Sequence, residues 1–458
     1  MGKKMLELDD IQSGVLRPRS APYAAAYVLF RIDDGAAGRE LMRRIRPVVA
    51  SAAHPESPAG DTWVSVALSF QGLKALGVPQ ASLDSFSLEF QQGMAARAGI
   101  LGDTGESSPE HWEKPLGSID VHVVLTALAP DTERLEAALA RARRQYEKIS
   151  GITAIWSQNC HALPNEREAF GFKDGIGHPA IEGSGIPGTN PHEAPLKPGE
   201  FVLGYLDEMG GMLPIPKPEV LGRNGSYVAF RKLHQRVAAF RQFLKANSSV
   251  PEDEELLAAK MMGRWRSGAP LALCPMHDNP ELGADPRRNN AFLFKEDDAI
   301  GYNTPCVSHI RRMNPRDAEV AGVVRIHRMI RRGTSYGPPL PDGILEDDGV
   351  ERGLMFAFVG ANLGRQFEFV QSEWMNDGSF FGGGATKDPV AGASSGTDSF
   401  SFPRRPLAMR VNGLSRFVVT RGGEYCFLPS LKALRWLGEL EGAVVAKRSR
   451  SPVGSLSS

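Results

Sequence analysis

The sequence predicts an α+β fold of two ferredoxin-like modules, each an antiparallel β-sheet with peripheral helices. In the N-terminal half, the predicted elements follow the order strand, helix, strand, strand, helix, strand. The C-terminal half gives a similar order without an exact sequence repeat. Residues 180–222 are rich in glycine and proline, which is typical of a loop or linker between the halves. We therefore predict domains at residues 1–220 and 221–445, followed by a disordered tail at 446–458.

The elements of the N-terminal half follow from the spacing of its apolar residues. Short apolar segments indicate strands, and apolar residues at helical spacing indicate helices. Asp131 and Gly151 mark the start and the end of the longest helix. The predicted strands are 24–32, 63–70, 120–128 and 152–157, and the predicted helices are 40–49, 71–76 and 132–149.

The elements of the C-terminal half follow from the same patterns. Arg421-Gly422-Gly423 lies between two apolar segments and predicts the turn of a β-hairpin. Residues 378–396 are rich in glycine and are predicted to form a loop. The predicted strands are 226–230, 353–359, 416–420 and 424–428, and the predicted helices are 235–245, 308–315, 364–374 and 430–440.

Composition and charge exclude several classes of protein. With 458 residues, of which 42% are hydrophobic, the chain can bury a large core. Its 53 Lys and Arg balance its 53 Asp and Glu, which argues against a dedicated nucleic-acid or membrane-surface binder. The sequence shows neither a secretion signal nor a long apolar run, so we expect a soluble cytoplasmic protein. The four cysteines lie far apart without CxxC spacing, which argues against a disulfide framework.

The stretch from Thr304 to Pro338 combines His309 with many arginines, among them Arg331 and Arg332, and with few acids. Such a stretch could form a nucleic-acid-binding face. It could also surround a polyanionic cofactor with a central metal, such as a haem with an axial histidine and arginine-bound propionates. The zero net charge weakens the first interpretation. A single histidine is more often structural, so this stretch alone does not decide between the two interpretations.

A Gly-rich turn surrounds Asp174, with the sequence GFKDGIGHP at residues 171–179. Its spacing does not match a dinucleotide-binding fingerprint. Taken alone, an aspartate in such a loop is more often a turn former than a catalytic group. The glycines would nevertheless let the backbone approach a flat ligand closely.

Seven segments of the chain form a specific set, because several unrelated stretches must occur together in one order. They are GFKDGIGHP (171–179), NGSYVAFRKLHQRV (224–237), MMGRWRSGAPL (261–271), PCVSHIRRMNPRD (305–317), IRRGTSYGP (330–338), GLMFAFVGANLGRQFEF (353–369) and FVVTRGGEYCFLPS (417–430). The set resembles the dye-decolourising peroxidases, most closely the larger cytosolic and fungal-like branch, over about residues 10–440. Two positions depart from the family pattern: Ser335 stands where a proline is usual, and Val307-Ser308 replaces small residues before His309.

The resemblance implies a haem peroxidase with one haem b per chain, bound mainly in the C-terminal module. His309 then corresponds to the axial iron ligand, Asp174 to the acid and base for peroxide, and Arg331 to the cation beside it. A carboxylate should hydrogen-bond the other nitrogen of His309, with Asp388 as the first candidate and Asp398 as the second. The further haem-binding residues that the resemblance implies are Arg316 at a propionate, Ile176, Gly177, Leu354 and Phe356.

The implied activity is the reduction of hydrogen peroxide and the oxidation of bulky organic reductants such as dyes and phenolics, through a ferryl intermediate. A homo-oligomer stays open, and neither a nucleic-acid nor a membrane partner is expected. The alternatives are a haem carrier or storage protein, a haem-iron extracting activity, and a ferredoxin-like protein without haem. A carrier has no need of Asp174 and Arg331 together, which favours the peroxidase. The tail segment SPVGSL at 451–456 loosely resembles peptides that load peroxidases into encapsulin shells, and a disordered end without function is the alternative.

Overall fold

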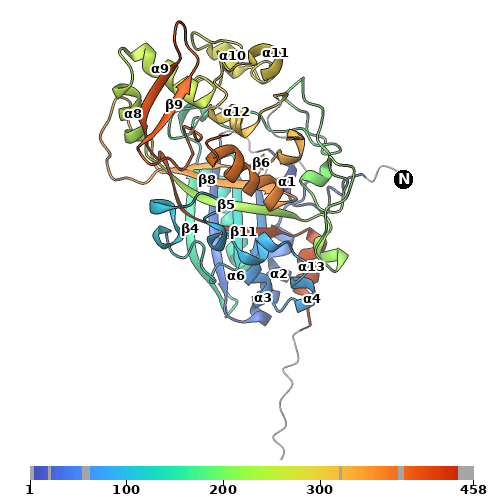
Figure 1. The fold of residues 1–458 in the computed structure, drawn as a ribbon. Coiled ribbons are helices and arrows are strands. Elements are labelled where there is room, and N and C mark those ends of the chain that lie inside the picture. Colours follow the sequence, from blue (N-terminus) through green and yellow to red (C-terminus); the bar gives the residue numbers. More distant parts are fainter. Residues whose placement is uncertain (1–4, 19–21, 54–61, 319–321, 380–385, 442–458) are drawn as a thin grey trace, which may run out of the picture.

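One antiparallel β-sheet of nine strands runs through the molecule, and helices pack around it (Figure 1). The structure is a computed structural model. Along the sheet, the strands follow the order β4-β1-β3-β2-β11-β5-β8-β6, and β7 also pairs with β8. Among the described helices, none has both the length and the apolar character of a membrane span. The structure describes residues 5–18, 22–53, 62–318, 322–379 and 386–441, so the predicted disordered tail at 446–458 lies outside the described residues.

The N-terminal half has the strand order β4-β1-β3-β2, in which the first strand lies between the fourth and the third. Helices α2 and α6 pack against each other and against strand β1. The apolar stripe of α6 consists of Leu135, Ala138 and Ala142, which are buried at helical spacing. The elements are α1 (Ser13–Leu16), β1 (Ala24–Ile32), α2 (Gly35–Ile45), β2 (Trp63–Ser69), α3 (Phe70–Ala75), α4 (Gln80–Leu83), α5 (Leu88–Gln92), β3 (Val123–Ala129), α6 (Thr132–Tyr146) and β4 (Ile152–His161).

The C-terminal half repeats this arrangement as β11-β5-β8-β6, again with the fourth, first, third and second strands in that order. The predicted fold class of two ferredoxin-like modules is therefore confirmed. The strands are β5 (Ser226–Gln235), β6 (Ile330–Arg331), β7 (Thr334–Tyr336), β8 (Gly353–Gly360) and β11 (Val418–Leu428), with a separate pair β9 (Asp398–Phe402) and β10 (Met409–Leu414). The helices are α7 (Glu219–Gly222), α8 (Val237–Ala246), α9 (Pro251–Met262), α10 (Pro280–Ala284), α11 (Phe294–Asp298), α12 (His309–Met313), the π-helices η8 (Leu363–Glu368) and η9 (Val370–Asn376), and α13 (Leu431–Gly438).

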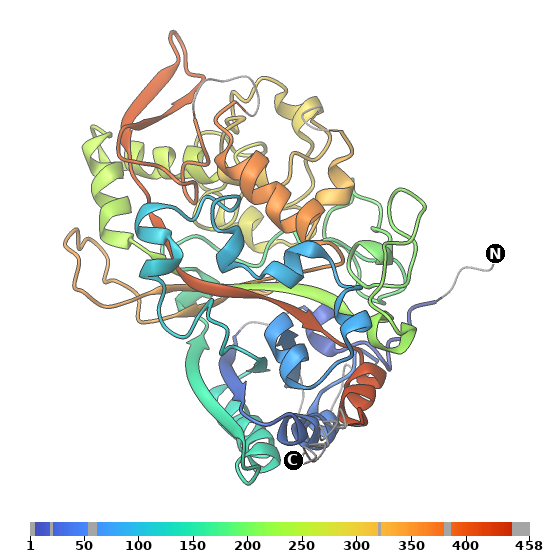
Figure 2. The same cartoon turned by 60° about the horizontal axis from the view of Figure 1, so that its bottom comes forward.

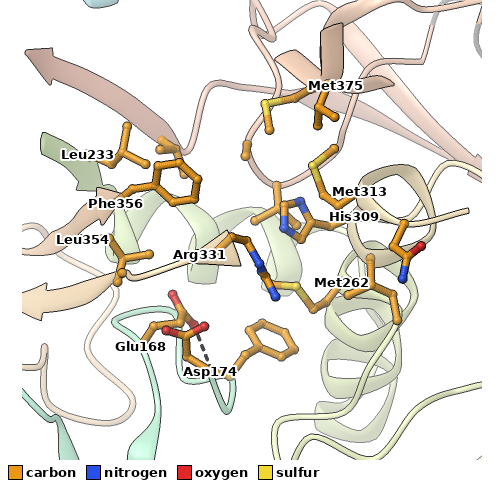
Figure 3. A pocket seen from close by; sticks show the side chains of 18 of the residues that line it. Glu168, Asp174, Leu233, Met262, His309, Met313, Arg331, Leu354, Phe356 and Met375 are labelled. Atoms are coloured by element: carbon orange, nitrogen blue, oxygen red, sulfur yellow. Dashed lines mark hydrogen bonds between the residues drawn. The ribbon is translucent and has the colours of Figure 1, made fainter. Parts of the chain in front are cut away.

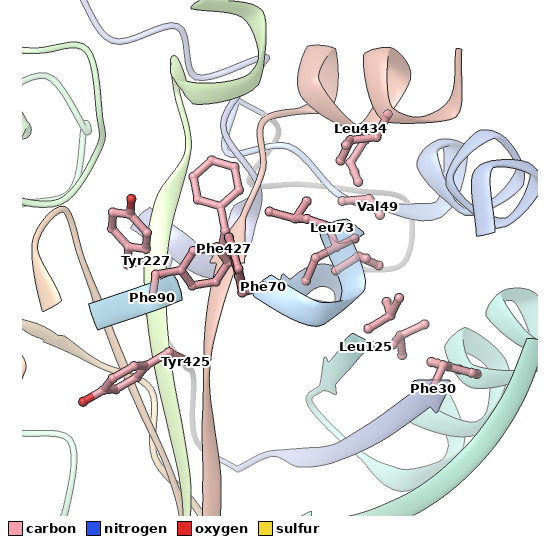
Figure 4. Packing of buried hydrophobic residues seen from close by; sticks show 14 of the residues in the cluster. Phe30, Val49, Phe70, Leu73, Phe90, Leu125, Tyr227, Tyr425, Phe427 and Leu434 are labelled. Atoms are coloured by element: carbon pink, nitrogen blue, oxygen red, sulfur yellow. The ribbon is translucent and has the colours of Figure 1, made fainter. Parts of the chain in front are cut away.

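Strand β11 joins the two halves, because it pairs with β5 along most of its length and with the end of β2. Figure 2 shows β5 (green) and β11 (red) side by side across the middle of the molecule. Buried side chains form apolar clusters that contain residues of both halves. In the cluster of Figure 4, Phe30 and Leu125 come from the N-terminal half, and Tyr227 and Phe427 from the C-terminal half. Because strand pairing crosses between the halves, the domain boundary near residue 220 stays a prediction.

The hairpin predicted around Arg421-Gly422-Gly423 is wrong, because one continuous strand, β11, covers these residues. The register against β5 shifts between Thr420 and Gly422, so a bulge accommodates the extra residue. Gly422 has a φ of 141°, and a Cβ atom there would lie 2.4 Å from the Cβ of Leu116. Glycine therefore allows the positive φ and the close packing that this position within the strand requires, and it does not mark a reversal of the chain.

The other predicted strands and helices are present, with shifts at their ends. Strand β5 continues to Gln235, and α2 begins at Gly35, earlier than predicted. The predicted helix at 364–374 is present as two π-helical segments. The sequence prediction missed β6 and β7, because strands of two and three residues are too short to show an alternating pattern.

Candidate active site

A cavity of about 280 Å³ lies between the C-terminal strands and helix α12. Leu233 of β5 and Leu354 and Phe356 of β8 give it an apolar wall on one side (Figure 3). His309, the first residue of α12, faces it from the other side. Segments distant in the sequence therefore meet at one enclosed space, as ligand sites commonly require.

A buried carboxylate holds His309 in place. The Nδ1 atom of His309 lies 2.8 Å from Oδ2 of Asp388, and the Asp388 side chain is fully buried. The other oxygen of Asp388 accepts hydrogen bonds from the main-chain N–H groups of Val390 and Ala391, at 2.9 and 2.8 Å. A proton held on Nδ1 leaves the lone pair of Nε2 available to a metal, which is how a carboxylate prepares a histidine ligand.

The charge state of Asp388 follows from opposing effects. Burial raises the pKa of this carboxyl, but the nearby charge of His309 and the hydrogen bond to it act in the other direction. The Ala391 N–H and the Arg312 guanidinium add to that opposition, and the pKa is lowered overall. Asp388 therefore stays ionised behind the imidazole. Asp398, the second candidate, lies in β9 and accepts a hydrogen bond from the N–H of Ser395 at 2.7 Å, whereas the described carboxylate partner of His309 is Asp388.

Asp174 and Arg331 point into the cavity opposite His309 (Figure 3). Arg331, on the short strand β6, donates from Nη2 to the carbonyl oxygen of Ile176 at 2.9 Å. Gly175 and Gly177 have φ values of 82° and 84°, so the loop around Asp174 needs glycine at these positions. Burial lowers the pKa of Arg331, and the charge of Asp174 opposes this shift. An arginine remains charged under these conditions and can stabilise an anion in the cavity.

Two further arginines, Arg264 and Arg316, line another part of the same cavity. Both donate from Nη2 to the side-chain oxygen of Asn290, at 2.6 and 2.9 Å. Their remaining described hydrogen bonds go to main-chain carbonyl oxygens rather than to carboxylates. Burial lowers the pKa of each guanidinium to about 9. Two adjacent cations supported by neutral groups favour a ligand with negative charges.

All the predicted site residues except Asp388 line this one cavity, and Asp388 lies directly behind His309. Sequence reasoning missed Arg264, Asn290 and Glu168, which also line the cavity. Arg264 lies in the segment MMGRWRSGAPL, which carried part of the family resemblance and could have indicated it. Asn290 and Glu168 lie in irregular segments, where no periodic pattern marks a buried polar residue.

The residues around the cavity fit a haem. His309 offers Nε2 to an iron, the apolar wall suits a flat macrocycle, and Arg264 and Arg316 suit two propionates. Within the described part of the chain, no cluster of three or more His, Cys, Asp or Glu could hold a bare metal ion. His309, with a buried carboxylate behind it, therefore fits an iron whose other ligands come from the cofactor itself.

Comparison with known proteins agrees with this geometry. A family model described as the DyP dimeric alpha+beta barrel domain matches residues 10–158. Peroxidase 2 of Mycetinis scorodonius is 34% identical over 467 residues, which cover 94% of this chain and 87% of that protein. A dye-decolorizing peroxidase of Exidia glandulosa is 32% identical, covering 94% of this chain and 86% of that protein.

The chain belongs to the dye-decolourising peroxidase family. The solved structure of a dye-decolorizing peroxidase in complex with 2,6-dimethoxyphenol is similar to it, with a TM-score of 0.82 and 28% identity. That likeness covers 95% of this chain and 100% of the other. Family membership confirms the predicted class of enzyme, so this dye-decolourising peroxidase is a haem peroxidase.

Proposed function

We propose that this peroxidase binds one haem b per chain on His309, reduces hydrogen peroxide, and takes electrons from bulky organic reductants. The observation that carries the proposal is the opposition of two sets of residues across one cavity. His309, backed by Asp388, faces the space from one side, and Asp174 and Arg331 face it from the other. A haem carrier needs the first set alone, whereas a peroxidase needs both.

Haem would be held by Nε2 of His309, with its propionates near Arg264 and Arg316 and its faces against apolar side chains. When bound, haem supplies the iron at which peroxide is cleaved and the electrons that reduce one of its oxygen atoms to water. The contact between Asp388 and Nδ1 fixes the orientation of the imidazole ring and increases its basicity.

Asp174 is suited to move the proton of the bound peroxide. Its carboxylate can accept a proton from one peroxide oxygen and return it to the other, which becomes the oxygen of water. Negative charge develops on that leaving oxygen before the proton arrives, and the guanidinium of Arg331 can stabilise it. The hydrogen bond from Arg331 to the Ile176 carbonyl positions the guanidinium in advance.

The reductant class is inferred from relatives. One similar structure contains 2,6-dimethoxyphenol, and several relatives are named for dye decolorization. Phenols and dyes give up single electrons, so two reductant molecules would restore the enzyme after each peroxide. We infer that this chain shares that substrate class.

A spectroscopic experiment tests the proposal. The purified protein, supplied with haem, should show the absorption band of a histidine-ligated haem, and peroxide should change that band. Addition of 2,6-dimethoxyphenol should then restore the starting spectrum while the phenol is oxidised. A protein that binds haem but does not react with peroxide would be a carrier instead, and one that binds no haem would exclude both functions.

A further inference from the structure

Glu168 is a buried carboxyl group that lines the cavity and has no part in the mechanism above. Its exposed fraction is 9%, and it lies on the same side of the cavity as Asp174, near Arg331 (Figure 3). Buried glutamates usually have a charged partner, since an isolated buried charge is costly. The described contacts of Glu168 are instead with neutral N–H donors. The burial of Glu168 among neutral donors therefore points to a structural role beside the cavity.

The Glu168 carboxylate closes the turn that precedes Asp174. Its Oε1 accepts from the N–H of Phe172 at 2.9 Å, and its Oε2 accepts from the N–H of Phe170 at 3.0 Å. The main chain repeats the link, since the N–H of Glu168 donates to the carbonyl oxygen of Phe172 at 2.9 Å. Asp174 follows two residues later, so the position of its side chain depends on this turn.

Gln235 connects the turn to the central sheet. Its side-chain amide, at the end of β5, donates to Oε2 of Glu168. Gln235 is 3% exposed and lines the same cavity. Among the described residues, no group donates a hydrogen bond to its side-chain oxygen. The described hydrogen bond of the Gln235 side chain is therefore the one that its amide donates to Glu168. This contact holds the loop against strand β5.

The charged groups around Glu168 determine how it affects its neighbour. Asp174 follows on the same loop, Arg331 approaches from β6, and Arg266 donates to the carbonyl oxygen of Phe170. Lys173 points instead toward Glu166, at 3.6 Å. Burial raises the pKa of Glu168, hydrogen bonds from Phe172, Gln235 and Phe170 oppose this, and the charge of Asp174 raises it further.

We propose that Glu168 is a positioning residue for Asp174: it fixes the preceding turn on β5 through Gln235, and so aims the Asp174 carboxylate at bound peroxide. This inference rests on the proposed function, because it assumes that Asp174 accepts the peroxide proton. Glu168 itself does not touch the peroxide and acts only through the loop and through its charge.

Glu168→Gln is the direct test. A glutamine side chain has one acceptor oxygen where the carboxylate has two, so the N–H of Phe170 or Phe172 loses its partner and the turn shifts. Displacement of a reacting group by about 1 Å can reduce a rate by about 100-fold. We expect haem content at the wild-type level and a rate constant for peroxide that falls by about tenfold or more.

Gln235→Met is the second variant, because methionine keeps the volume of the side chain and removes only the amide. It leaves the backbone contacts of Glu168 intact, so we expect a smaller loss in the peroxide rate constant. This variant also keeps the inference testable if Glu168→Gln does not fold. Glu424→Gln is the matched control. Glu424 is likewise a buried carboxyl that accepts from two main-chain N–H groups, of Met94 and Tyr425, but it does not line the cavity.

Two measurements separate positioning from loss of stability. The first is the peroxide rate constant as a function of pH, from the haem absorption in a stopped-flow instrument. Without the contacts of Glu168, this rate constant should fall at every pH, because the Asp174 carboxylate is displaced. The second is the equilibrium affinity for cyanide, which enters as neutral HCN and must give up its proton. That affinity should fall in parallel with the peroxide rate constant.

Each outcome has one meaning. The inference is supported if Glu168→Gln lowers both the peroxide rate constant and the cyanide affinity. Gln235→Met should lower them less, and Glu424→Gln should leave them unchanged. Wild-type kinetics and an unchanged pH profile in both Glu168→Gln and Gln235→Met, while Asp174→Asn is slow, would overturn it and leave the proposed function intact. If the wild-type holoenzyme itself fails to react with peroxide, the proposed function fails first.

Discussion

The two walls of the cavity hold their functional side chains in different ways. On the His309 wall, the imidazole is held by a charged side chain, the buried carboxylate of Asp388. On the Asp174 wall, main-chain groups do much of this work, since Arg331 donates to the carbonyl oxygen of Ile176 and Glu168 accepts main-chain N–H groups. A charged partner fixes both position and charge, as a permanent ligand requires. A main-chain partner fixes position and leaves the charge available to a reacting molecule.

The largest expected effect comes from removing the functional residue of the first wall. His309→Ala should abolish or strongly reduce haem retention, because His309 is the cavity histidine that is held by the buried carboxylate of Asp388. The measurement is haem per protein chain after purification, from absorbance and protein assay. His192→Ala, an exposed histidine, is the control and should retain haem. A His309→Ala protein with the wild-type haem spectrum would show that the axial ligand lies elsewhere.

The second effect comes from the opposite wall and should leave haem binding intact. Asp174→Asn and Arg331→Leu should each slow the reaction with peroxide by about 100- to 1,000-fold. The double variant should lose less than the product of the two factors, because both residues act on one step. Stopped-flow absorbance on haem-matched samples measures these rates. Equal rates in the wild type and in both single variants would contradict the assignment of this wall.

A third, smaller effect concerns Asp388, the partner of His309. Asp388→Asn keeps the shape of the side chain but removes its charge, and should reduce haem affinity or activity by about 10- to 100-fold. Titration of haem into the haem-free protein measures the affinity, and dye oxidation by the loaded protein measures the activity. Asp398→Asn removes a carboxylate outside the cavity and should have no such effect. If Asp388→Asn and Asp398→Asn have the same haem affinity and dye-oxidation activity, the contact between His309 and Asp388 does not contribute to function.

Glu424 is a buried carboxyl away from both walls, so it shows the effect of a buried charge on stability without any contact to the cavity. Burial raises the pKa of Glu424 from 4.5 to about 7. Between these values, the folded protein holds a proton that the unfolded chain has lost, so Glu424 should make the protein less stable as pH rises through this window. The contribution is at most about 3 kcal/mol. Thermal unfolding of wild type and Glu424→Gln across that range should differ in slope, and parallel curves would contradict the expectation.

The smallest effect on the cavity is expected from the tail. A chain ending at Val445 lacks SPVGSL and should react with peroxide at the wild-type rate, since the described cavity contains no residue beyond Thr420. Co-expression with an encapsulin shell protein tests the tail itself. The full-length chain should appear in purified shells and the shortened chain should not. Equal absence of both would show that the tail is not a loading signal.

The sequence was sufficient to single out the residues to which the proposed function assigns chemistry. His309, Asp174 and Arg331 lie in segments specific enough to identify a family, and the fold brings them to the same cavity. Asp388 was a weaker prediction, because nothing in the sequence distinguishes it from Asp398. Their different surroundings appear only once residues 309 and 388, far apart in the chain, are brought into contact.

Arg264, Asn290 and Glu168 were not predicted, because they act through tertiary contacts. Arg264, Asn290 and Arg316 come from three separate segments, and only the fold brings them to one oxygen atom. Glu168 has the sequence context of an ordinary loop residue. The glycines at 422 and 423 show the converse error: a local turn signal was overridden by pairing with β5 over the whole of β11.

The position of β11 has a consequence for biosynthesis. This strand supplies Val418 and Thr420 to the cavity, and among the described strands it is the last to leave the ribosome. Until it emerges, β2 and β5 each lack a neighbour, and the lining of the cavity is incomplete. On the proposed function, a nascent chain stalled before residue 418 should carry no haem even when haem is abundant, because this strand is missing from the cavity.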